Sequence, residues 1–573
     1  MATHFLFLVS AFLVLSVSAD VSIDCGSTDF YTDENSIVWM GDNDIIQNGV
    51  IEVVQPSNSI SHVMDSLRVF PTRKKNCYAI NVDKGEKILV RASFYYGNYD
   101  KKSSPPTFDL QFDGNDWATV VTSNTEVASY EAIYVTKGEV ASVCVAQTMP
   151  DQFPFISALE LRSLSSDMYS LADSNHALFT KSRVAYGSNV TIRYSDDFYD
   201  RIWIPALAGN GLLQVTSDFN PILINVSTGD NPPQAVLQNA ITTSSTSQKR
   251  SFRVLRNNQS ISDPILPPYG GVSEWTFSNI TASSSTTFSL VATADSTLPP
   301  LINAMEVFYI NLDKLTDGTN SNDVDGLVAL QNEFAVLLEW SGDPCLPAPY
   351  SWDWINCSND SVPRVTALFL SSFGLSGALP DFSSMNALQT IDLHNNSLYG
   401  PIPDLLGTLP NLKQLNLADN QFSGSIPTSL SKNNNLNLVV TGNPDLCTSG
   451  KSCQTTDTPT SSGYAGSGKK KSNNLPAILG ATIPSFLVFW AIVGVLAILH
   501  HKRRTAAVAA MSAGPNRPTG APQGTGINMQ MAGKIGQAVI HEFKVNMEEQ
   551  VNEELADQIN QQAQDAGYND SNT

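Results

Sequence analysis

Five charged residues that lie close together in the sequence could catalyse a hydrolysis. They are Arg193, Asp196, Asp197, Asp200 and Arg201. Two carboxyl groups can act as acid and base when a glycosidic bond is cleaved. The same charges can instead neutralise one another where two lobes of a protein meet. We favour the structural role and predict no catalytic residue in this segment.

Motifs for other kinds of catalysis are missing from the sequence. A kinase needs a glycine-rich loop, a strand lysine and the HRD and DFG elements, and none of them occurs in the 573 residues. The histidines show no zinc-binding spacing, and no G-x-S-x-G nucleophile elbow is found. We therefore expect no enzyme, no cofactor and no metal site.

The composition limits the partners of the chain. Lys and Arg number 33 against 54 Asp and Glu, which gives a formal net charge of -21. Such a protein repels nucleic acid unless it has a basic patch, and no such patch stands out. A length of 573 residues indicates three or four modules at roughly 100 to 200 residues per domain.

Two apolar segments indicate a membrane protein of the secretory pathway. Residues 1–19 have the short apolar core and small-residue cleavage site of a signal peptide. A second apolar run can cross roughly 30 Å of hydrocarbon as one helix, and a basic stop follows it from His500 to Arg504. We predict a single-pass type I protein of the plasma membrane, with its N-terminus extracellular. The predicted parts are a stalk (454–474), a transmembrane helix (475–499) and a cytosolic tail without a kinase (500–573).

The cysteines agree with this topology. All seven precede the predicted span, as expected for disulfides in an oxidising compartment. Cys25, Cys77 and Cys144 form an odd set, whose pairing stays open and which leaves one thiol free or intermolecular. The same part of the chain carries sequons for N-glycosylation. They are at Asn189, Asn225, Asn258, Asn279, Asn356, Asn359 and Asn395.

The clearest internal signal is a leucine-rich repeat. Leu388 and Leu412 begin two copies of the pattern L-x-x-L-x-L-x-x-N-x-L-x-G-x-I-P, a looser copy begins at Val365 and a truncated one at Leu436. The leucines of each coil fill a shared core, and Asn396 can bond backbone groups where the chain turns. A short solenoid of this kind has apolar ends that need caps.

Cysteines mark the two predicted caps of the solenoid. Residues 323–357 contain a linker helix and the N-terminal cap, which we expect to hold a disulfide between Cys345 and Cys357. The repeats and the C-terminal cap occupy residues 358–453, where Cys447 and Cys453 have a structural role.

Residues between the leucines face the concave side of the predicted solenoid. This surface is small and mostly polar, and a sugar on Asn395 would crowd it. It could bind a ligand, but a role as spacer is about equally supported. Its predicted members are Phe369, Thr390, Asp392, His394, Gln414, Asn416 and Asp419.

The N-terminal half has short β-type runs between Gly, Pro, Asn and Ser clusters, which predicts β-sandwich or jelly-roll lobes. Seven segments in a fixed order resemble one family, the plant malectin-like, leucine-rich-repeat receptor-like proteins and receptor kinases. The resemblance implies two tandem all-β jelly-roll lobes, at residues 20–165 and 166–312. The segments are Ile23–Gly26, Arg68–Tyr78, Phe94–Asp100, Pro154–Arg162, Arg193–Trp203, Leu298–Val307 and Gly342–Cys345.

The second lobe departs from the family pattern. The family usually has a long, aromatic-rich strand segment between the counterparts of Pro232–Thr243 and Arg250–Arg253, whereas this chain has only SSTSQK there. The second lobe is therefore predicted to lack one or two strands near residues 243–250. The missing strands would expose a sheet edge, which proteins normally cover or pair. A specialised interface, a splice form and an imperfect gene model are the alternatives.

The resemblance also implies a candidate sugar site, because animal malectin binds short glucose oligomers. A sugar site needs aromatic faces for C–H surfaces and polar groups for hydroxyls. One segment of the first lobe offers this mixture: Tyr95, Tyr96, Asn98, Tyr99 and Asp100. The alternative, which we favour, is that the tyrosines pack at a strand end and Asp100 caps a turn.

The predicted cytosolic tail has one patterned segment. Apolar residues recur at steps of three and four, so this segment could form an amphipathic helix that docks a partner. Self-association and marginal disorder are equally plausible. The residues of the pattern are Ile540, Phe543, Met547, Val551, Leu555 and Ile559.

We therefore expect a receptor-like protein or co-receptor. It would recognise an extracellular carbohydrate, such as a cell-wall glycan, or a peptide or protein ligand. Because the sequence shows no kinase of its own, it would signal through a receptor kinase or another membrane receptor. The alternative is a tether between membrane and cell wall, and an extracellular glycoside hydrolase is third.

Overall fold

The computed structural model describes residues 20–209, 212–217, 229–243, 249–268, 272–283, 285–311, 313–447 and 538–546. All of these residues belong to one compact unit. The predicted signal peptide, stalk and membrane span lie outside them. Within the described stretches, no helix is both long and apolar enough to cross a bilayer.

The first lobe consists of two main sheets that share one apolar core, and a short third sheet. The larger sheet has the order β2 (Phe30–Thr32), β3 (Val38–Gly41), β1 (Val21–Asp24), β13 (Ala158–Ser163), β7 (Lys87–Phe94) and β10 (Ala128–Val135). The second has the order β6 (Lys75–Asn81), β11 (Val140–Ala146), β8 (Thr107–Phe112) and β9 (Asn115–Val121). The third consists of β12 (Phe155–Ile156), β5 (Ser66–Val69) and β4 (Val50–Val53), and the short 3-10 helices η1 (Pro56–Asn58) and η2 (His62–Met64) lie between β4 and β5 in the chain.

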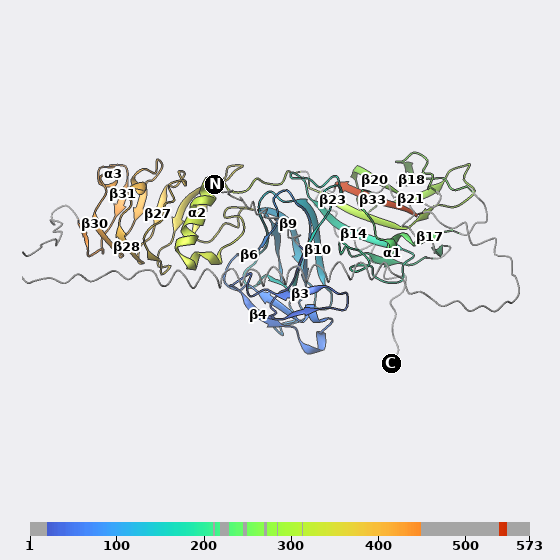
Figure 1. The fold of residues 1–573 in the computed structure, drawn as a ribbon, viewed down its shortest axis with the longest axis horizontal. Helices are drawn as coiled ribbons and strands as arrows, with labels where there is room; N and C mark the ends of the chain where they lie inside the picture. The colour runs from blue at the N-terminus through green and yellow to red at the C-terminus, as the bar shows by residue number, and fades with distance from the viewer. Residues whose placement is uncertain are drawn as a thin grey trace, which may run out of the picture. The chain divides into compact units, whose positions relative to one another are not determined.

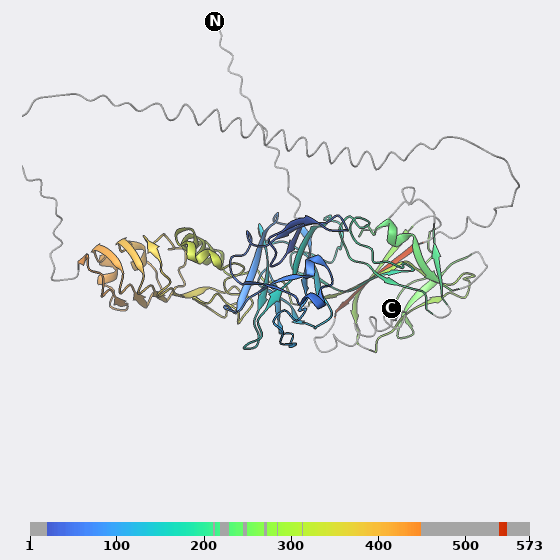
Figure 2. The same cartoon turned by 90° about the horizontal axis from the view of Figure 1, so that it is seen from below.

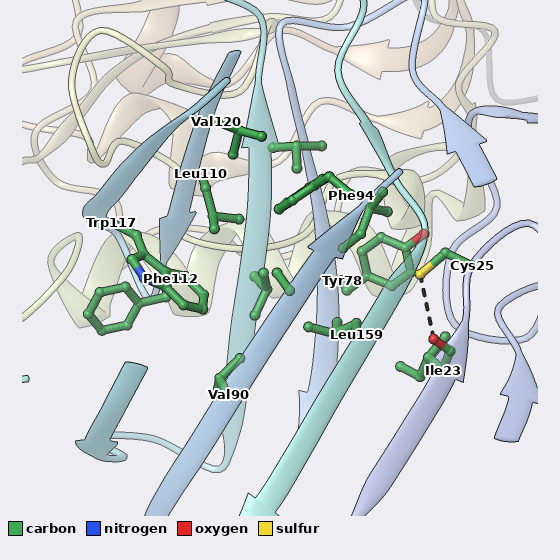
Figure 3. Packing of buried hydrophobic residues seen from close by; sticks show 14 of the residues in the cluster. Ile23, Cys25, Tyr78, Val90, Phe94, Leu110, Phe112, Trp117, Val120 and Leu159 are labelled. Carbon is green, nitrogen blue, oxygen red and sulfur yellow. Dashed lines mark hydrogen bonds between the residues drawn. The ribbon is translucent and has the colours of Figure 1, made fainter. Parts of the chain in front are cut away.

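Strand β7 lies at the centre of this lobe. Both of its edges are paired, to β13 and β10, and all of its residues are buried, including the polar residues Lys87, Arg91 and Ser93. Alternate residues such as Val90 and Phe94 pack in the core between the sheets, together with Leu110 and Phe112 of β8 (Figure 3). Leu89 points the other way, into a second apolar cluster with Ile133 and Leu178.

The larger sheet continues from the first lobe into the second. Strand β10 pairs antiparallel with β14 through Ala132 and Phe179 and through Ile133 and Leu178. The second lobe then adds strands in the order β14 (Leu178–Tyr186), β23 (Ala304–Ile310), β33 (Ala538–Asn546) and β20 (Val272–Thr281) (Figure 1). Strand β15 (Ile204–Ala206) pairs in parallel with β14.

Two short sheets and one turn of helix complete the described part of the second lobe. One sheet has the order β16 (Leu213–Thr216), β17 (Asn239–Thr242) and β22 (Leu301–Ile302), and the other has the order β19 (Gln259–Ser260), β18 (Phe252–Arg256) and β21 (Phe288–Ala292). Helix α1 (Gln234–Leu237) precedes β17.

Strand β33 corrects the prediction of an amphipathic helix in the tail. Ala538–Asn546 is a strand that runs parallel to β20 and β23 and lies between them, which Figure 2 shows from a second direction. The helix prediction is therefore wrong for these nine residues. Valine, isoleucine and phenylalanine in this segment favour strands, and the two neighbouring strands satisfy its backbone groups. The rest of the predicted helix, from Met547 to Ile559, lies outside the described residues.

A helix connects the lobes to the repeats. Helix α2 (Ser321–Glu333) begins where the Asn320 side chain accepts a hydrogen bond from the Asn322 backbone N–H, at 3.1 Å. It buries Leu327 and Leu330 against the repeats and is followed by the 3-10 helix η4 (Ala335–Glu339).

The repeats form a short parallel solenoid with two ribbons of strands. One ribbon has the order β24 (Ile355–Cys357), β25 (Val365–Phe369), β27 (Thr390–Asp392), β29 (Gln414–Asn416) and β31 (Asn437–Val439). The other has the order β26 (Ser376–Gly377), β28 (Ser397–Pro401), β30 (Gln421–Ser425) and β32 (Leu446–Cys447), with η5 (Asp404–Gly407) and α3 (Thr428–Ser431) between strands. The leucines of successive coils form one core between the ribbons.

Candidate functional site

The first ribbon of the solenoid presents an ordered surface. Register pairing places Thr390 level with Gln414 and with Ala367, and Asp392 level with Asn416 and Phe369. The residues between them, such as Ile391, point into the core. All seven predicted concave residues are at least partly accessible. The surface therefore offers two parallel rows of side chains to a ligand.

The chemistry of this surface is polar with one apolar ring. Phe369 is 40% exposed. The Nδ1 atom of His394 lies 2.7 Å from Oδ1 of Asp392, so these two side chains hold each other in place. Asp419 is exposed at the turn that follows β29. Carboxylates, amides and a hydroxyl together can bind the hydroxyls of a sugar or the backbone of a peptide.

Asparagines hold the coils together behind this surface. The amide nitrogen of Asn396 donates to the carbonyl oxygens of Leu370 and Leu393, at 2.8 and 3.0 Å. Asn420 repeats this in the next coil, donating to Leu393 at 2.9 Å and to Ala418 at 3.0 Å. The bonds that the sequence predicted for Asn396 are therefore present. They join each coil to the one before it.

The tyrosine segment of the first lobe is mainly part of the core. Tyr95 and Tyr96 are 2% and 0% exposed, and the Tyr95 hydroxyl donates to the carbonyl oxygen of Asn58 at 2.6 Å. The Tyr96 hydroxyl donates to Asp100, and the ring of Tyr99 packs edge-on against that of Tyr96, 5.4 Å between centroids. The rings of Tyr95 and Tyr96 are therefore covered by the protein, and the ring of Tyr99 is half-buried.

The remaining polar residue of that segment shapes the turn. Asn98 has a φ of 54°, and its side-chain oxygen accepts a hydrogen bond from the Ser103 backbone N–H at 2.8 Å. Asn tolerates this left-handed conformation better than most residues. The segment therefore builds a strand end and a turn.

The charged cluster that could have supported hydrolysis is mostly buried and neutralised. Asp200 accepts hydrogen bonds from Arg193 at 2.9 Å and from Arg162 at 2.7 Å, and the Arg91 guanidinium donates to its backbone oxygen at 2.6 Å. Burial alone would raise the pKa of Asp200, but the hydrogen bond from Arg193 and the charges of Arg91 and Arg162 outweigh it and lower the pKa well below its usual range. A carboxyl group held this way cannot deliver a proton near neutral pH.

The second half of the cluster is neutralised in the same manner. Asp197 forms an ion pair with Arg201 at 2.8 Å and accepts a hydrogen bond from the Trp203 indole at 2.7 Å. Asp196 is the exception, because it is exposed. The cluster therefore joins the two lobes and lacks a proton donor and acceptor facing one another.

Sequence inspection missed the partners of this network. Arg91 of β7 lies between Glu131 of β10 and Glu160 of β13, pairing with Glu131 at 2.9 Å and also with Glu160. Burial would raise the pKa of Glu131, but Arg183 and Arg91 lower it to about 2. These residues are far apart in sequence, so only the alternation of charged residues in otherwise apolar strands could have indicated them.

The first lobe and the N-terminal cap meet in a joint that the sequence did not predict. We call it the lobe–cap joint and define it by Arg73, Lys75 and Cys77 of the lobe and by residues 339–346 of the cap. The guanidinium of Arg73 lies 3.8 Å from the centroid of the Trp340 ring and donates to the Glu339 carbonyl oxygen at 2.8 Å.

A buried lysine is central to the lobe–cap joint. The Lys75 ammonium donates to the carbonyl oxygens of Asp343 and Leu346, at 2.7 and 2.9 Å. Burial lowers the pKa of Lys75 to about 8, although the charges of Asp343 and Asp353 act in the opposite direction. Gly342 lies directly against the disulfide Cys77–Cys144, since a Cβ there would be 2.5 Å from the Cys77 sulfur.

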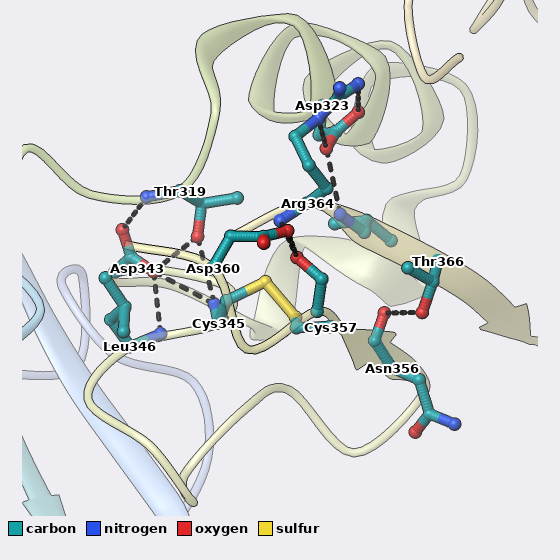
Figure 4. Close-up of a disulfide and its surroundings, with 12 residues drawn as sticks. Thr319, Asp323, Asp343, Cys345, Leu346, Asn356, Cys357, Asp360, Arg364 and Thr366 are labelled. Carbon is teal, nitrogen blue, oxygen red and sulfur yellow. Dashed lines mark hydrogen bonds and ion pairs between the residues drawn. A yellow bond between two sulfur atoms is a disulfide. The ribbon is translucent and has the colours of Figure 1, made fainter. Parts of the chain in front are cut away.

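The cap contains the second disulfide, Cys345–Cys357 (Figure 4). Its loop is held by the Asp343 carboxylate, which accepts hydrogen bonds from the Thr319 hydroxyl at 2.6 Å and from the Leu346 backbone N–H at 2.8 Å. These bonds explain why Asp and Cys occur together in the Gly342–Cys345 segment.

The other predicted cysteines and sequons have distinct surroundings. Cys25 is the free thiol of the odd set, and it is completely buried, which rules out a disulfide with another chain in this fold. Cys453 lies outside the described residues. The sequon Asn225 does too, and the described sequon asparagines are exposed. They are Asn189, Asn258, Asn279, Asn356, Asn359 and Asn395.

Family models match both kinds of module. The model of the Malectin-like domain matches residues 23–250 and 243–310, about half of the chain, and that of the Leucine Rich Repeat matches residues 387–409 and 411–433. This chain belongs to the malectin-like domain family. The two malectin-like matches overlap at residues 243–250, where the sequence analysis predicts missing strands.

Curated relatives of this malectin-like protein come from Arabidopsis thaliana. The probable LRR receptor-like serine/threonine-protein kinase At1g05700 is 34% identical over 429 residues, 68% of this chain and 50% of that protein. Uncharacterized protein At1g24485 is 34% identical over 351 residues, 55% of this chain and 69% of that protein. The LRR receptor-like serine/threonine-protein kinase IOS1 is 31% identical over 406 residues, 64% of this chain and 45% of that protein. The malectin-like chain thus spans about half the length of both kinases.

Solved ectodomains also align with the malectin-like chain. The ANX2 ectodomain from Arabidopsis thaliana aligns with a TM-score of 0.40 and 16% identity, covering 52% of this chain and 97% of that one. A chain from the structure of plant peptide RALF23 in complex with FER and LLG2 aligns with a TM-score of 0.36 and 17% identity, covering 43% of this chain and 80% of that one.

Proposed function

We propose that this malectin-like protein is a cell-surface receptor-like protein or co-receptor. It recognises an extracellular carbohydrate or a peptide or protein ligand, and it signals through a partner receptor kinase. It crosses the plasma membrane once, at residues 475–499, with the lobes and the repeats outside the cell. Family membership supports this role, because relatives such as At1g05700 are named as LRR receptor-like kinases.

The observation that carries the proposal is the first ribbon of the repeats, which bears the residues predicted for the concave surface. Its strands are in register, so Phe369 and the polar residues beside it form a continuous surface with fixed spacing. The asparagine bonds behind the surface pre-order it, which lowers the entropy that a ligand must offset on binding. Ligand contact therefore needs little rearrangement of the solenoid.

The buried charge network also favours recognition over hydrolysis. Asp200 and Asp197 are engaged by arginines within the protein, and both are nearly inaccessible. A glycoside hydrolase needs two carboxyl groups that flank the substrate bond. These two carboxylates face arginines and do not face a cleft.

Point substitutions on the concave surface test ligand recognition. We expect Phe369→Ala in the full-length protein to reduce binding to a glycan array or to a library of secreted peptides by about tenfold, as for a partly exposed aromatic anchor. The matched control is Tyr399→Ala, because Tyr399 is 53% exposed on the other ribbon. Equal binding by both variants, with unchanged folding, would contradict a role for the concave surface.

Deletion of part of the tail tests signalling. The full-length protein and a variant lacking residues 535–562 are expressed in plant cells, and receptor kinases that copurify with each are identified. We expect a defined receptor kinase to be captured by the full-length protein and lost with the deletion. Capture of no receptor kinase by either form would support a tether to the cell wall instead.

A further inference from the structure

Among its described residues, the second lobe has no central strand that comes from its own part of the chain. In the first lobe, β7 lies between β13 and β10 and is antiparallel to both. In the second lobe, the corresponding place between β23 and β20 is occupied by β33, which is parallel to both and comes from residues 538–546 (Figure 1). We call the space between Val272–Thr281 and Ala304–Ile310 the strand slot.

The topology shows which strands are missing. In the first lobe, β5 belongs to a short sheet with β12 and β4, and β6 and β7 lie between β5 and β8 in the chain. In the second lobe, β17 belongs to the equivalent sheet with β22 and β16, and β18 follows it directly, with only residues 243–251 between the two strands. The family match is also divided at residues 243–250. The described residues of the second lobe therefore contain no counterpart of β6 or β7.

The first lobe indicates which side chains a strand in the slot would meet. There, Arg91 of the central strand lies level with Glu131 on one neighbour and with Glu160 on the other. The second lobe has one glutamate on each strand that flanks the slot, Glu274 on β20 and Glu306 on β23, and the register of β33 places these two glutamates two residues apart along the slot. A central strand in the second lobe would therefore pass between two carboxyl groups.

The two glutamates of the strand slot differ in whether a cation neutralises the carboxylate. Glu306 is 2% exposed and forms an ion pair with Arg183 at 2.5 Å. Glu274 has no ion pair within the described residues, and its carboxylate accepts a hydrogen bond from the Asp230 backbone N–H at 3.4 Å. Burial raises the pKa of Glu274 to about 8, and the nearby Asp230 and Glu306 add to the shift. A cation beside Glu274 would reverse this shift.

Strand β33 does not supply that cation. Its register places Ile540 level with Glu274, and it places Glu542 level with Glu306. In addition, a chain that crosses the membrane once at residues 475–499 would have residues 538–546 on the other side of the bilayer from the second lobe.

We propose that the strand slot is an acceptor site for an extended, basic polypeptide segment supplied from outside the cell, which completes the sheet of the second lobe with an arginine or lysine between Glu274 and Glu306. The backbone bonds to β20 and β23 give affinity, and the basic residue gives specificity. Arg91 between Glu131 and Glu160 is the precedent within the same chain. The proposal rests on the membrane topology given under the proposed function.

A peptide with the sequence of β7 is a direct probe of the strand slot. The probe is fluorescein-labelled KILVRASF, the sequence of residues 87–94, mixed with the full-length protein in lipid nanodiscs. We expect saturable binding by fluorescence anisotropy. The peptide with the change Arg91→Glu should bind at least tenfold more weakly, and a peptide with Val90→Pro should also lose binding because proline removes a ladder hydrogen bond. No saturable binding, or equal binding of the Arg and Glu peptides, would overturn the proposal.

Substitution in the protein assigns the effect to the slot. Glu274→Gln should reduce the preference for the Arg peptide over the Glu peptide at least fivefold, while Glu126→Gln, an exposed glutamate of the first lobe, should leave the preference unchanged. A preference that survives Glu274→Gln would place the peptide elsewhere and overturn the proposal.

Cysteine pairs identify the natural occupant. Val307 of β23 lies level with Phe543 of β33, so a chain carrying Val307→Cys and Phe543→Cys can form a crosslink only if the tail enters the slot. A crosslink within one chain would show that the tail occupies the slot, and a crosslink between two chains would show a second copy there. Either result overturns the proposal and the single-span topology together. Failure of peptide binding without any crosslink overturns this proposal alone and leaves the receptor function to the tail-deletion test.

Discussion

The guanidinium of Arg73 stacks 3.8 Å from the centroid of the Trp340 ring, and this contact joins the first malectin-like lobe to the cap of the repeats. Arg73 also donates to the backbone oxygen of Glu339 and forms an ion pair with its carboxylate. The pair lies at the edge of the lobe–cap joint, where Lys75 is buried in the middle. Substitution of individual residues of the joint should therefore change its stability, which can be measured in the first lobe and in the cap.

We predict that Arg73→Ala loosens the lobe–cap joint. Loss of the stacked guanidinium should cost about 1–2 kcal/mol, the range for a partly desolvated cation–π pair. Hydrogen exchange measured by mass spectrometry should become faster in residues 335–346 and stay unchanged in residues 388–430. The control is Lys74→Ala, because Lys74 is the exposed neighbouring cation. Equal exchange in both variants would show that the stack adds no stability.

A pair of glycines separates steric from conformational effects. Gly342 and Gly374 both have a φ of 72°, but a Cβ on Gly342 would be 2.5 Å from the Cys77 sulfur, whereas nothing lies within 4 Å of a Cβ on Gly374. Gly374→Ala should therefore cost only about 1–2 kcal/mol for the left-handed backbone. Gly342→Ala should cost about 1–3 kcal/mol more because of overpacking. Thermal unfolding of the two variants measures the difference, and equal melting temperatures would contradict the packing against the disulfide.

The buried charge of Lys75 should give the joint a pH dependence above neutrality. Burial lowers the pKa of Lys75 from 10.5 to about 8. Between these values the unfolded chain binds a proton that the folded protein does not, so stability rises with pH across this window. The increase can reach about 3 kcal/mol between pH 8 and 10.5. Urea unfolding of the wild type and of Lys75→Met, followed at both pH values, should show this rise in the wild type alone. Parallel curves would disprove it.

The network between the lobes should fail in acid. Glu131 has a pKa lowered from 4.5 to about 2. A carboxylate with a lowered pKa contributes stability that is complete above pH 4.5 and is lost as the pH falls towards 2. Glu131→Gln should therefore lower stability by about 3–5 kcal/mol at pH 7, since it leaves Arg91 and Arg183 with one partner fewer, and it should flatten the acid dependence. Glu126→Gln serves as the exposed control, and acid unfolding followed by tryptophan fluorescence measures both variants.

The repeats could be predicted well because their signal is local. The leucine spacing and Asn396 act within one coil or on the neighbouring coil, so the sequence pattern carries both the core and the bonds of the turns. The β-rich lobes were predicted from the order of short motifs. In both cases, nearby residues carry the information.

The joint and the network could not be predicted because they depend on distant pairs. Arg91 meets Glu131, Glu160 and Asp200 only after four segments of the chain have folded together. The burial of Tyr95 also follows from the way β7 ends inside the lobe, which no local pattern reveals. The strand at residues 538–546 shows the same limit, since an apolar periodicity does not distinguish helix from strand when a neighbouring sheet offers backbone partners.

Alkylation of the buried Cys25 thiol can be used to measure opening of the first lobe. It is 0% exposed, and burial raises its pKa well above the ordinary value, so an alkylating reagent cannot react with it while the first lobe is closed. The other described cysteines are in disulfides and do not react. The rate of alkylation at Cys25 therefore reports the opening of the first lobe. Such a rate can be followed in a living cell, where the other modules and a bound partner are all present.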